Sequence, residues 1–308
     1  MAKIQVKRSN NMSQLFQRIV VVGAGGFVGQ RLLDTLKPLA GDVVPIGRAQ
    51  ADLTDDDGAV RLSRLMRDGD AVVFLSAVTP DKSGDLDILA ANIKIAETFL
   101  AAIRDVALEH VVYLSSDAVY PFQTETITEE TATRAENPYA QAHIEREALF
   151  RSALGTGLTI LRPTLIYGPG DTHSSYGPSR LCKEGLQTGT IHLFGEGEEL
   201  RDHVFIDDVT GAIKGALVHR PEGPLNVASG DPIHYADLAG VIAQQVDRDV
   251  SVIGRDRKQP VTHRRFDISG LRHALPDHVS TQIRDGVTLT LAALRRQTTD
   301  PSDSRIVQ

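Results

Sequence analysis

The sequence predicts an α/β fold, a doubly wound parallel sheet with a smaller C-terminal α/β lobe. Short apolar runs alternate along the chain with longer segments whose apolar residues have helical spacing. These runs are apolar through their whole length, which is typical of parallel strands covered by helices on both faces. After about residue 167 the alternation gives way to turns rich in Gly and Pro, which predicts the second lobe.

The first lobe is expected to alternate strands and helices. The strands are predicted at 19–22, 42–46, 71–75, 110–114 and 158–161. The helices between them are predicted at 27–36, 57–67, 85–105 and 138–154. This order predicts strands that run parallel, because each helix returns the chain to the same end of the sheet.

The second lobe is expected to be less regular. Its short strands are predicted at 191–194 and 204–206, and its helices at 207–219, 234–246 and 279–296. We therefore divide the chain into a tail (1–17), a first lobe (18–166), a second lobe interleaved with the first (167–297) and a polar C-terminal tail (298–308).

Composition and charge argue against several classes of protein. The 308 residues carry a net charge of −7 with both signs interspersed, so no broad basic surface for nucleic acid is expected. The one cysteine, Cys182, cannot form a disulfide within the chain, and a reducing, cytoplasmic location fits best. No apolar stretch of membrane-spanning length is found, and the histidines form no recognisable metal-ligand cluster. We therefore expect no nucleic acid, membrane or metal partner.

A glycine motif, Gly23-Ala-Gly-Gly26-Phe-Val-Gly29, follows the first strand and opens the first helix. In this context Gly23 would form a tight turn, Gly26 would let the backbone approach a pyrophosphate, and Gly29 would let helix pack on strand. The anion would lie at the helix N-terminus. The motif thus predicts a Rossmann site for NAD or NADP, the alternative being a glycine-rich turn that binds nothing.

The end of the second strand bears on which cofactor is bound. A carboxylate there accepts a hydrogen bond from the ribose 2′-hydroxyl, whereas an arginine accommodates a 2′-phosphate. Arg48 at this position favours NADP, unless it is simply an exposed loop residue, and Asp52 keeps NAD open. Further cofactor contacts are predicted at Phe27, Val28, Leu53, Ser76 and Ala77.

A second group of polar residues follows the strand at 110–114. Ser115-Ser116-Asp117 and Tyr120 lie at the carboxyl end of this strand, where an open parallel sheet places its ligands. Tyr139 follows on the helix at 138–154, and His143 lies one turn further on the same face.

With these motifs the sequence resembles the extended short-chain dehydrogenase/reductase superfamily, specifically its nucleotide-sugar epimerases, dehydratases and ketoreductases. The resemblance covers about residues 18–230. Its landmarks are Gly23–Gly29, Asn92, Ser115–Tyr120, Tyr139–His143, and the segments 161–170, 201–208 and 225–230.

The resemblance implies hydride transfer between a nicotinamide and a sugar carbon. Tyr139 would give or take the hydroxyl proton, and Ser116 would hydrogen-bond the same oxygen. Two donors aimed at a carbonyl oxygen stabilise the charge that develops there and supply the proton. The alternatives are that Ser116 caps a strand end and that Tyr139 is a half-buried aromatic residue. The resemblance also implies Asn92 as a cofactor contact.

One position departs from the superfamily: His143 stands where its motif has lysine. That lysine holds the nicotinamide ribose and lowers the pKa of the tyrosine. An unperturbed tyrosine has a pKa of ~10. A cation within about 4–6 Å could lower that value by roughly 1–3, and a neutral imidazole could not. His143 could still hydrogen-bond the ribose, and in its protonated form it could partly replace the charge.

Three interpretations of His143 stay open: a working substitute for the lysine, a weakened or specialised enzyme, and a nucleotide binder without catalysis. Because Ser116 and Tyr139 are both present, the working hypothesis is that activity survives.

The substrate is indicated less directly. Asp117 occupies the position where dehydratases of the superfamily have an acid, but Ala118 replaces their second carboxylate, which argues against a dehydratase. Tyr120-Pro121, together with Arg48, favours an NADP-dependent 4-keto-sugar reductase over an epimerase.

The resemblance implies that Arg201 pairs with a nucleotide diphosphate, because it matches the position that does so in the superfamily. A guanidinium suits this role, since it presents a planar fork of donors. The alternative for Arg201 is an ion pair with Glu198 or Glu199, which would favour a non-nucleotide substrate such as a lactone, steroid or aldehyde. His173 and Tyr176 are predicted to line the sugar pocket. The resemblance also implies a homodimer in which the helices at 85–105 and 138–154 form a four-helix bundle with their copies.

Overall fold

A six-stranded sheet organises the first lobe, and every strand pair in it is parallel. The computed structural model describes residues 15–79, 85–124, 126–172 and 177–299. The strands of this sheet are β1 (Phe16–Val22), β2 (Ala40–Ile46), β3 (Ala71–Phe74), β4 (His110–Leu114), β6 (Leu158–Pro163) and β11 (Gly223–Val227). Their order, β11-β6-β4-β3-β1-β2, confirms the predicted α/β class with a doubly wound sheet.

The chain changes direction across the sheet at β1. After β1 it adds β2 at one edge, and it then returns to place β3 on the other side of β1. Val22 ends level with Ile46 on β2 and with Phe74 on β3. Such a switch leaves a crevice beyond the carboxyl ends of the two neighbouring strands, where open α/β sheets bind ligands.

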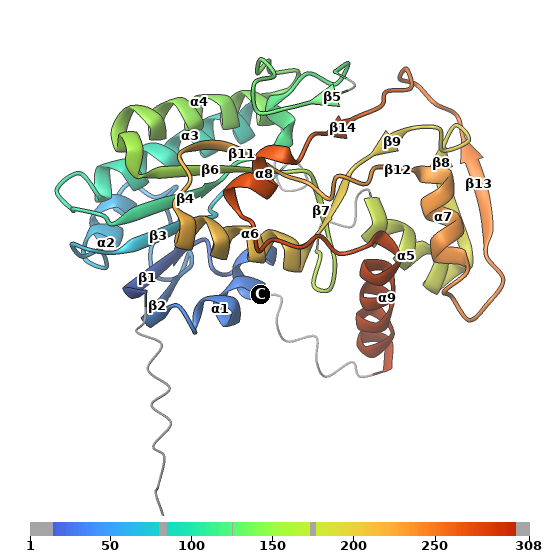
Figure 1. The fold of residues 1–308 in the computed structure, drawn as a ribbon, viewed down its shortest axis with the longest axis horizontal. Coiled ribbons are helices and arrows are strands. Elements are labelled where there is room, and N and C mark those ends of the chain that lie inside the picture. The colour runs from blue at the N-terminus through green and yellow to red at the C-terminus, as the bar shows by residue number, and fades with distance from the viewer. Residues whose placement is uncertain (1–14, 80–84, 125, 173–176, 300–308) are drawn as a thin grey trace, which may run out of the picture.

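Alternate residues of β1 point to opposite faces of the sheet and into separate cores. Ile19 and Val21 pack with residues of α1 and α6, whereas Val20 and Val22 pack with residues of α3 and α4. Figure 1 shows α3 and α4 above the sheet and α1 and α6 below it. The helices are α1 (Phe27–Leu36), α2 (Gly58–Ser63), α3 (Asp85–Ala102), α4 (Pro138–Leu154), α6 (Ile206–His219) and α8 (Ser269–Ala274).

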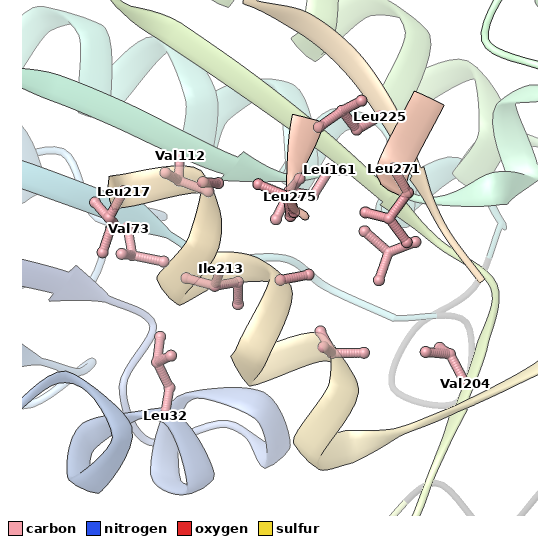
Figure 2. Packing of buried hydrophobic residues seen from close by; sticks show 14 of the residues in the cluster. Leu32, Val73, Val112, Leu161, Val204, Ile213, Leu217, Leu225, Leu271 and Leu275 are labelled. Atoms are coloured by element: carbon pink, nitrogen blue, oxygen red, sulfur yellow. The ribbon is translucent and has the colours of Figure 1, made fainter. Parts of the chain in front are cut away.

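Figure 2 shows the core beneath the sheet. Ile213 and Leu217 of α6 lie between Leu32 of α1 and the strand residues Val73 and Val112. All five side chains are fully buried. Since burying one such aliphatic side chain is worth about 1.5–3 kcal/mol, this layer fixes α1, and with it the glycine turn, against the sheet.

The second lobe has its own small core. It contains α5 (Gly177–Thr188), α7 (Tyr235–Ala243), α9 (Ile283–Thr299), β8 (Thr190–Phe194) and β13 (Ser251–Arg255). Short strand pairs complete the described chain: β7 (Leu165–Tyr167) with β10 (His203–Phe205), β9 (Leu200–Arg201) with β12 (Ile233–His234), and β5 (Thr126–Ile127) with β14 (Arg265–Phe266). Leu181, Ile191, Leu238, Ile242 and Leu291 form the centre of this core.

The two lobes are interleaved. α6, β11 and α8 follow residue 167 in the chain but pack in the first lobe. The sequence did not predict β11 as a strand, because its first residues are Gly223 and Pro224. Proline is tolerated here since β11 is an edge strand with only β6 as neighbour.

The boundaries of several elements match the sequence prediction. β4, α1 and α4 begin and end as predicted. α4 starts where Asn137 Oδ1 accepts a hydrogen bond from the backbone N–H of Ala140 at 2.8 Å, with Pro138 in the first turn. α2 is shorter than the predicted helix at 57–67, since the chain turns after Ser63 and Arg67 N donates to Asp70 Oδ2 at 2.8 Å. Among the described helices, none combines the length and the hydropathy needed to cross a bilayer.

Gly29 offers a test of the helix–strand packing. A Cβ at Gly29 would lie 2.6 Å from the carbonyl oxygen of Gly23 and 2.7 Å from Ala24 Cα. We expect Gly29→Ala to lower the free energy of unfolding by about 1–3 kcal/mol, because an overpacked contact forces the backbone to move. Urea denaturation measures this. Gly25→Ala is the matched control, since a Cβ at Gly25 meets nothing within 4 Å; equal stability of the two variants would contradict the packing argument.

Candidate active site

The glycine turn lies at the carboxyl end of β1. Gly23 has a φ of +93°, which a residue with a Cβ rarely adopts, and its N–H donates to Ile46 O at 2.8 Å. Gly26 is the N-cap of α1 and has no side chain to cap the helix. The first turn contains no acidic residue, and the first N–H groups of a helix lack partners within it. Because these N–H groups face no acidic residue, the N-terminus of α1 can receive an anion. Phe27 and Val28 are half-buried beside this turn.

The residues after β2 have unequal access to this site. Arg48 is exposed in the turn that follows the strand. Asp52 is half-buried, and hydrogen bonds from the Thr54 hydroxyl and N–H lower its pKa, with a smaller contribution from the charge of Arg48. Leu53 is only 3% exposed and packs in the core, so its side chain is not available to a ligand. Arg48 and Asp52 therefore remain the candidates that distinguish the two cofactors.

Two buried side chains, Arg146 and Asn92, bind the backbone of the segment after β3. Arg146 Nη2 donates to Ser76 O at 2.6 Å, and its Nη1 donates to Asn92 Oδ1 at 2.9 Å. Asn92 also accepts from Val78 N at 3.1 Å and donates to Val78 O and Ile88 O, both at 2.9 Å. The carboxamide of Asn92 has then no free donor or acceptor for a cofactor. Its position allows it to shape the segment that carries Ser76 and Ala77.

Ser116 caps the turn that follows β4. Its Oγ accepts from Ala118 N at 3.1 Å in the short 3₁₀ helix η1 (Asp117–Val119). This bond uses a lone pair of the oxygen and leaves the hydroxyl proton available, so capping does not prevent Ser116 from donating to a substrate oxygen.

Tyr139 lies in the first turn of α4, close to the end of β4. α4 packs against η1, which brings the tyrosine to the side of the sheet where Ser116 lies. The rings of Tyr139 and His143 meet edge to face, with 4.6 Å between their centroids. Tyr139 is half-buried and His143 is buried, so the partly exposed start of α4 passes into its buried part at this pair of rings.

His143 points into the protein. It is 1% exposed, its Nδ1 lies 2.8 Å from the Tyr113 hydroxyl and 3.5 Å from Ser115 Oγ, and its Nε2 is buried. Burial, and then the positive charge of Arg146, hold the pKa of His143 well below its ordinary value of 6.5. This environment favours the neutral imidazole, which argues against the possibility that a protonated His143 partly replaces the lysine charge.

Sequence analysis missed the charged residues behind the site. Arg146 is fully buried and lies over the rings of Phe74 and Tyr113, with its Cζ 5.4 and 5.1 Å from the two centroids. Glu147 pairs with Arg162, through Nε to Oε1 at 2.9 Å and Nη2 to Oε2 at 2.6 Å. The sequence of α4 contained a signal for these residues. Arg146 and Glu147 follow His143 by three and four residues, so all three lie on the same, core-facing side of the helix.

Asp117 is paired with an arginine that sequence analysis also missed. Arg264 Nη1 lies 3.3 Å from Asp117 Oδ2, and Nη2 donates to Asp117 O at 3.0 Å. Burial raises the pKa of Asp117, although the charges of Arg264 and Arg201 oppose this. The carboxyl group thus belongs to a largely buried ion pair next to Ser116.

Arg201 is held by neighbours in the second lobe. Its guanidinium donates to Leu200 O at 2.9 Å, Thr262 O at 2.6 Å and Thr262 Oγ1 at 2.7 Å, and it lies 3.6 Å from Glu199 Oε1. The structure thus contains the ion pair that the sequence left open as an alternative. His173 and Tyr176 lie outside the described residues.

The described residues offer little to metal or thiol chemistry. Within the described ranges no three His, Cys, Asp or Glu side chains gather in a way that could hold a metal ion. Burial raises the pKa of Cys182 to about 12, so its thiol is unreactive near neutral pH.

Relatives of known sequence and structure resemble this chain along most of its length. A protein of Bacillus subtilis (strain 168), named an uncharacterized UDP-glucose epimerase YtcB, is 23% identical over 309 residues, covering 90% of this chain and 98% of the relative. The structure of MoeE5 in complex with UDP-glucose and NAD superposes with a TM-score of 0.79 at 22% identity, covering 91% of this chain and 99% of that chain. RMD from Pseudomonas aeruginosa, complexed with NADPH, gives a TM-score of 0.80 at 23% identity, covering 92% and 99%.

The family assignment rests on a match that contains the features described above. The model of the NAD dependent epimerase/dehydratase family matches residues 19–228. This range includes the glycine turn, the end of β4 and the first turns of α4, and it exceeds half of the chain. The chain therefore belongs to the NAD dependent epimerase/dehydratase family.

Proposed function

We propose that this enzyme is an NAD(P)-dependent oxidoreductase or epimerase that transfers a hydride at a carbon of a nucleotide sugar. Tyr139 acts as the acid or base, and Ser116 donates a hydrogen bond to the reacting oxygen. The observation that carries the proposal is the packing of α4 against η1, which brings the start of α4, with Tyr139, to the turn that Ser116 caps after β4. This turn and the glycine turn after β1 both lie at the carboxyl ends of the parallel strands, with β3 between β4 and β1. Solved relatives that hold UDP-glucose with NAD, or NADPH, support the substrate and cofactor classes.

The residues present fit a dinucleotide. The N-terminus of α1 would receive the pyrophosphate, and the segment at Ser76 and Ala77 would lie along the cofactor. His143 Nε2 is a buried polar atom with no partner among the described residues, as expected of a group that awaits a ligand. When bound, the nicotinamide supplies or accepts the hydride.

The neutral state of His143 bears on the direction of the chemistry. A neutral imidazole at residue 143 places no positive charge beside the ring of Tyr139, unlike the lysine of the superfamily. A protonated tyrosine can donate to a carbonyl oxygen that is being reduced, but an alcohol that is being oxidised needs a base. An epimerase must perform both steps, whereas a reductase needs only the first. We therefore favour reduction of a keto-sugar, and Arg48 favours NADPH as its donor.

Two observations favour other functions. The same neutral His143 would suit a protein that binds the dinucleotide and has lost its chemistry. The contacts of Arg201 with Thr262 and Glu199 leave it less free to pair with a diphosphate, which would suit a reductase of a non-nucleotide carbonyl compound.

Removal of the Tyr139 hydroxyl separates catalysis from binding. We expect Tyr139→Phe to lower the turnover of keto-sugar reduction by about 10²–10⁴-fold, the usual contribution of a positioned acid. The dissociation constant of NADPH, measured by calorimetry, should not change. If wild type binds the nucleotide but reduces no keto-sugar or simple ketone, the binding protein is the correct interpretation.

Arg48 tests the cofactor preference. We expect Arg48→Ala to weaken NADPH binding by about tenfold or more, because one charge-assisted hydrogen bond is worth roughly 1.5–3 kcal/mol. NADH binding, titrated in parallel, should stay the same. Equal losses for both nucleotides would exclude a 2′-phosphate contact, and Asp52→Asn would then test a ribose contact.

The protonation state of His143 predicts a pH effect. Its pKa is lowered in the folded state, so its contribution to stability is present above the ordinary pKa of 6.5 and is lost as the pH falls below that value. We expect the NMR signal of its imidazole to show no protonation between pH 8 and 5 in the folded protein. In a urea-unfolded sample, the same histidine should titrate normally. A folded His143 that titrates within this window would restore the charged interpretation.

A further inference from the structure

The strand β13 forms an open edge of the second lobe. Within the described ranges it pairs with β8 alone, and Figure 1 shows it as the orange arrow on the right-hand rim, away from α3 and α4. All five of its residues are exposed. Val252 and Ile253 are each 48% exposed, although successive residues of a strand point to opposite faces. No described residue therefore covers either face of β13 or its free edge.

The two edges of the main sheet, in contrast, are protected against pairing with another chain. This sheet ends in β2 and β11, which contain Pro45 and Pro224. Proline has no N–H to donate, and edge strands commonly use it to prevent such pairing. β13 has no proline, and its one charged residue, Arg255, comes at its end. This strand thus lacks the protection that the other two edges have.

The backbone hydrogen bonds of β13 show which residues face the open edge. Ser251 N donates to the carbonyl oxygen of the residue before β8 at 2.9 Å, and Arg255 O accepts from the N–H of the residue after β8 at 2.8 Å. Both residues therefore face β8. Because successive residues of a strand turn their backbone groups to opposite sides, Val252 and Gly254 present N–H and C=O groups to the open edge.

A second copy of β13 fits this edge in antiparallel orientation about a two-fold axis. An axis at Val252 places this residue opposite itself and places Gly254 opposite Val250 of the second copy. The backbone groups that face the open edge then bond to each other across the axis. Such a contact is isologous, since both copies use the same surface.

Opposite charges meet in this register. Asp249 lies opposite Arg255 of the second copy, and Arg248 lies opposite Asp256, and the two-fold axis repeats each pair. Opposite charges that face each other directly across an antiparallel pair interact favourably. All four residues are exposed, and no ion pair within the described chain uses them. The segment is therefore complementary in charge to its own reversed copy.

Neighbouring registers lack this match. An axis at Ile253 would place Arg248 opposite Lys258 of the second copy, and like charges so placed are destabilising. An axis at Ser251 or at Gly254 would place Ile253 opposite a charged residue. The charges and the apolar residues thus select the same register.

We propose that two copies of this chain associate through β13, which forms an antiparallel pair about a two-fold axis at Val252. The pairing joins two β8–β13 units into one continuous sheet and covers an edge that the described chain leaves open. It lies away from α3 and α4, so it doubles any assembly that those helices form (Figure 1). The proposal does not depend on the proposed function, since no candidate catalytic residue takes part.

Asp249→Arg and Arg255→Asp test the register. Each variant places like charges opposite each other in its own assembly, so we expect the dissociation constant of the β13 contact to rise by about tenfold. Analytical ultracentrifugation over a range of concentrations measures this constant, and wild type should contain twice as many copies as either variant. Asp277→Arg makes the same charge change at an exposed residue outside this edge and should behave as wild type.

A mixture of the two variants is diagnostic. One copy then carries positive charges at positions 249 and 255, and the other carries negative charges at both. Every pair that the register brings together is again of opposite sign, so a mixed assembly should form. Native mass spectrometry identifies it, because the two variants differ in mass. If wild type associates and the mixture does not, the register is wrong and the proposal fails.

Hydrogen exchange locates the contact. The amides of Val252 and Gly254 should exchange more slowly at high than at low concentration of wild type, and at one fast rate in Asp249→Arg. Equal numbers of copies in wild type and both variants would refute the proposal. Slow exchange of these amides at every concentration, in wild type and variants alike, would refute it too and would indicate a different occupant of the edge.

Discussion

The buried ion pair between Glu147 and Arg162 connects the elements that carry the candidate chemistry. Glu147 belongs to α4 and Arg162 to β6, and both side chains are at most 3% exposed. Arg162 also donates to the Tyr120 hydroxyl at 2.7 Å, and Tyr120 donates in turn to Asn226 Oδ1 at 2.8 Å on β11. Burial alone would lower the pKa of Arg162, but the hydrogen bonds and charge of Glu147 outweigh it and raise the pKa. Loss of one partner from such a pair typically costs about 3–5 kcal/mol, because the other charge stays buried.

This pair explains why α4 can bury so many polar groups. The helix presents Tyr139 at the rim of the site, and His143, Arg146 and Glu147 at successive positions further inside. Each of these three has partners on a strand or on a neighbouring helix. Hydrogen bonds to these partners offset the free-energy cost of removing the polar groups from water. The arrangement gives the tyrosine a fixed place, since α4 can neither rotate nor slide without breaking several bonds at once.

Much of the fold and of the candidate site could be predicted from the sequence, and the reason why the rest could not is physical. The bounds of α1, β4 and α4 follow from local signals: a glycine turn, a short apolar run, and an Asn-Pro helix start. The place of Ser116 at the carboxyl end of β4 follows from the parallel sheet. The state of His143 does not, because it depends on burial and on Tyr113, 30 residues away. The contact of Arg201 with Thr262 spans 61 residues and has no signature in the sequence.

The pairing of Asp117 with Arg264 affects how the two lobes can move. Arg264 lies in the segment that runs from the second lobe back to the first, where β14 pairs with β5 (Figure 1). The side chains of Arg264 and Asp117 are 4% and 14% exposed. A hinge motion that lifted this segment would break the ion pair and leave the nearly buried guanidinium of Arg264 without its charged partner. Exchange of substrate and product is therefore expected to be slow if it needs this segment to lift, and fast only along a route that leaves the segment in place.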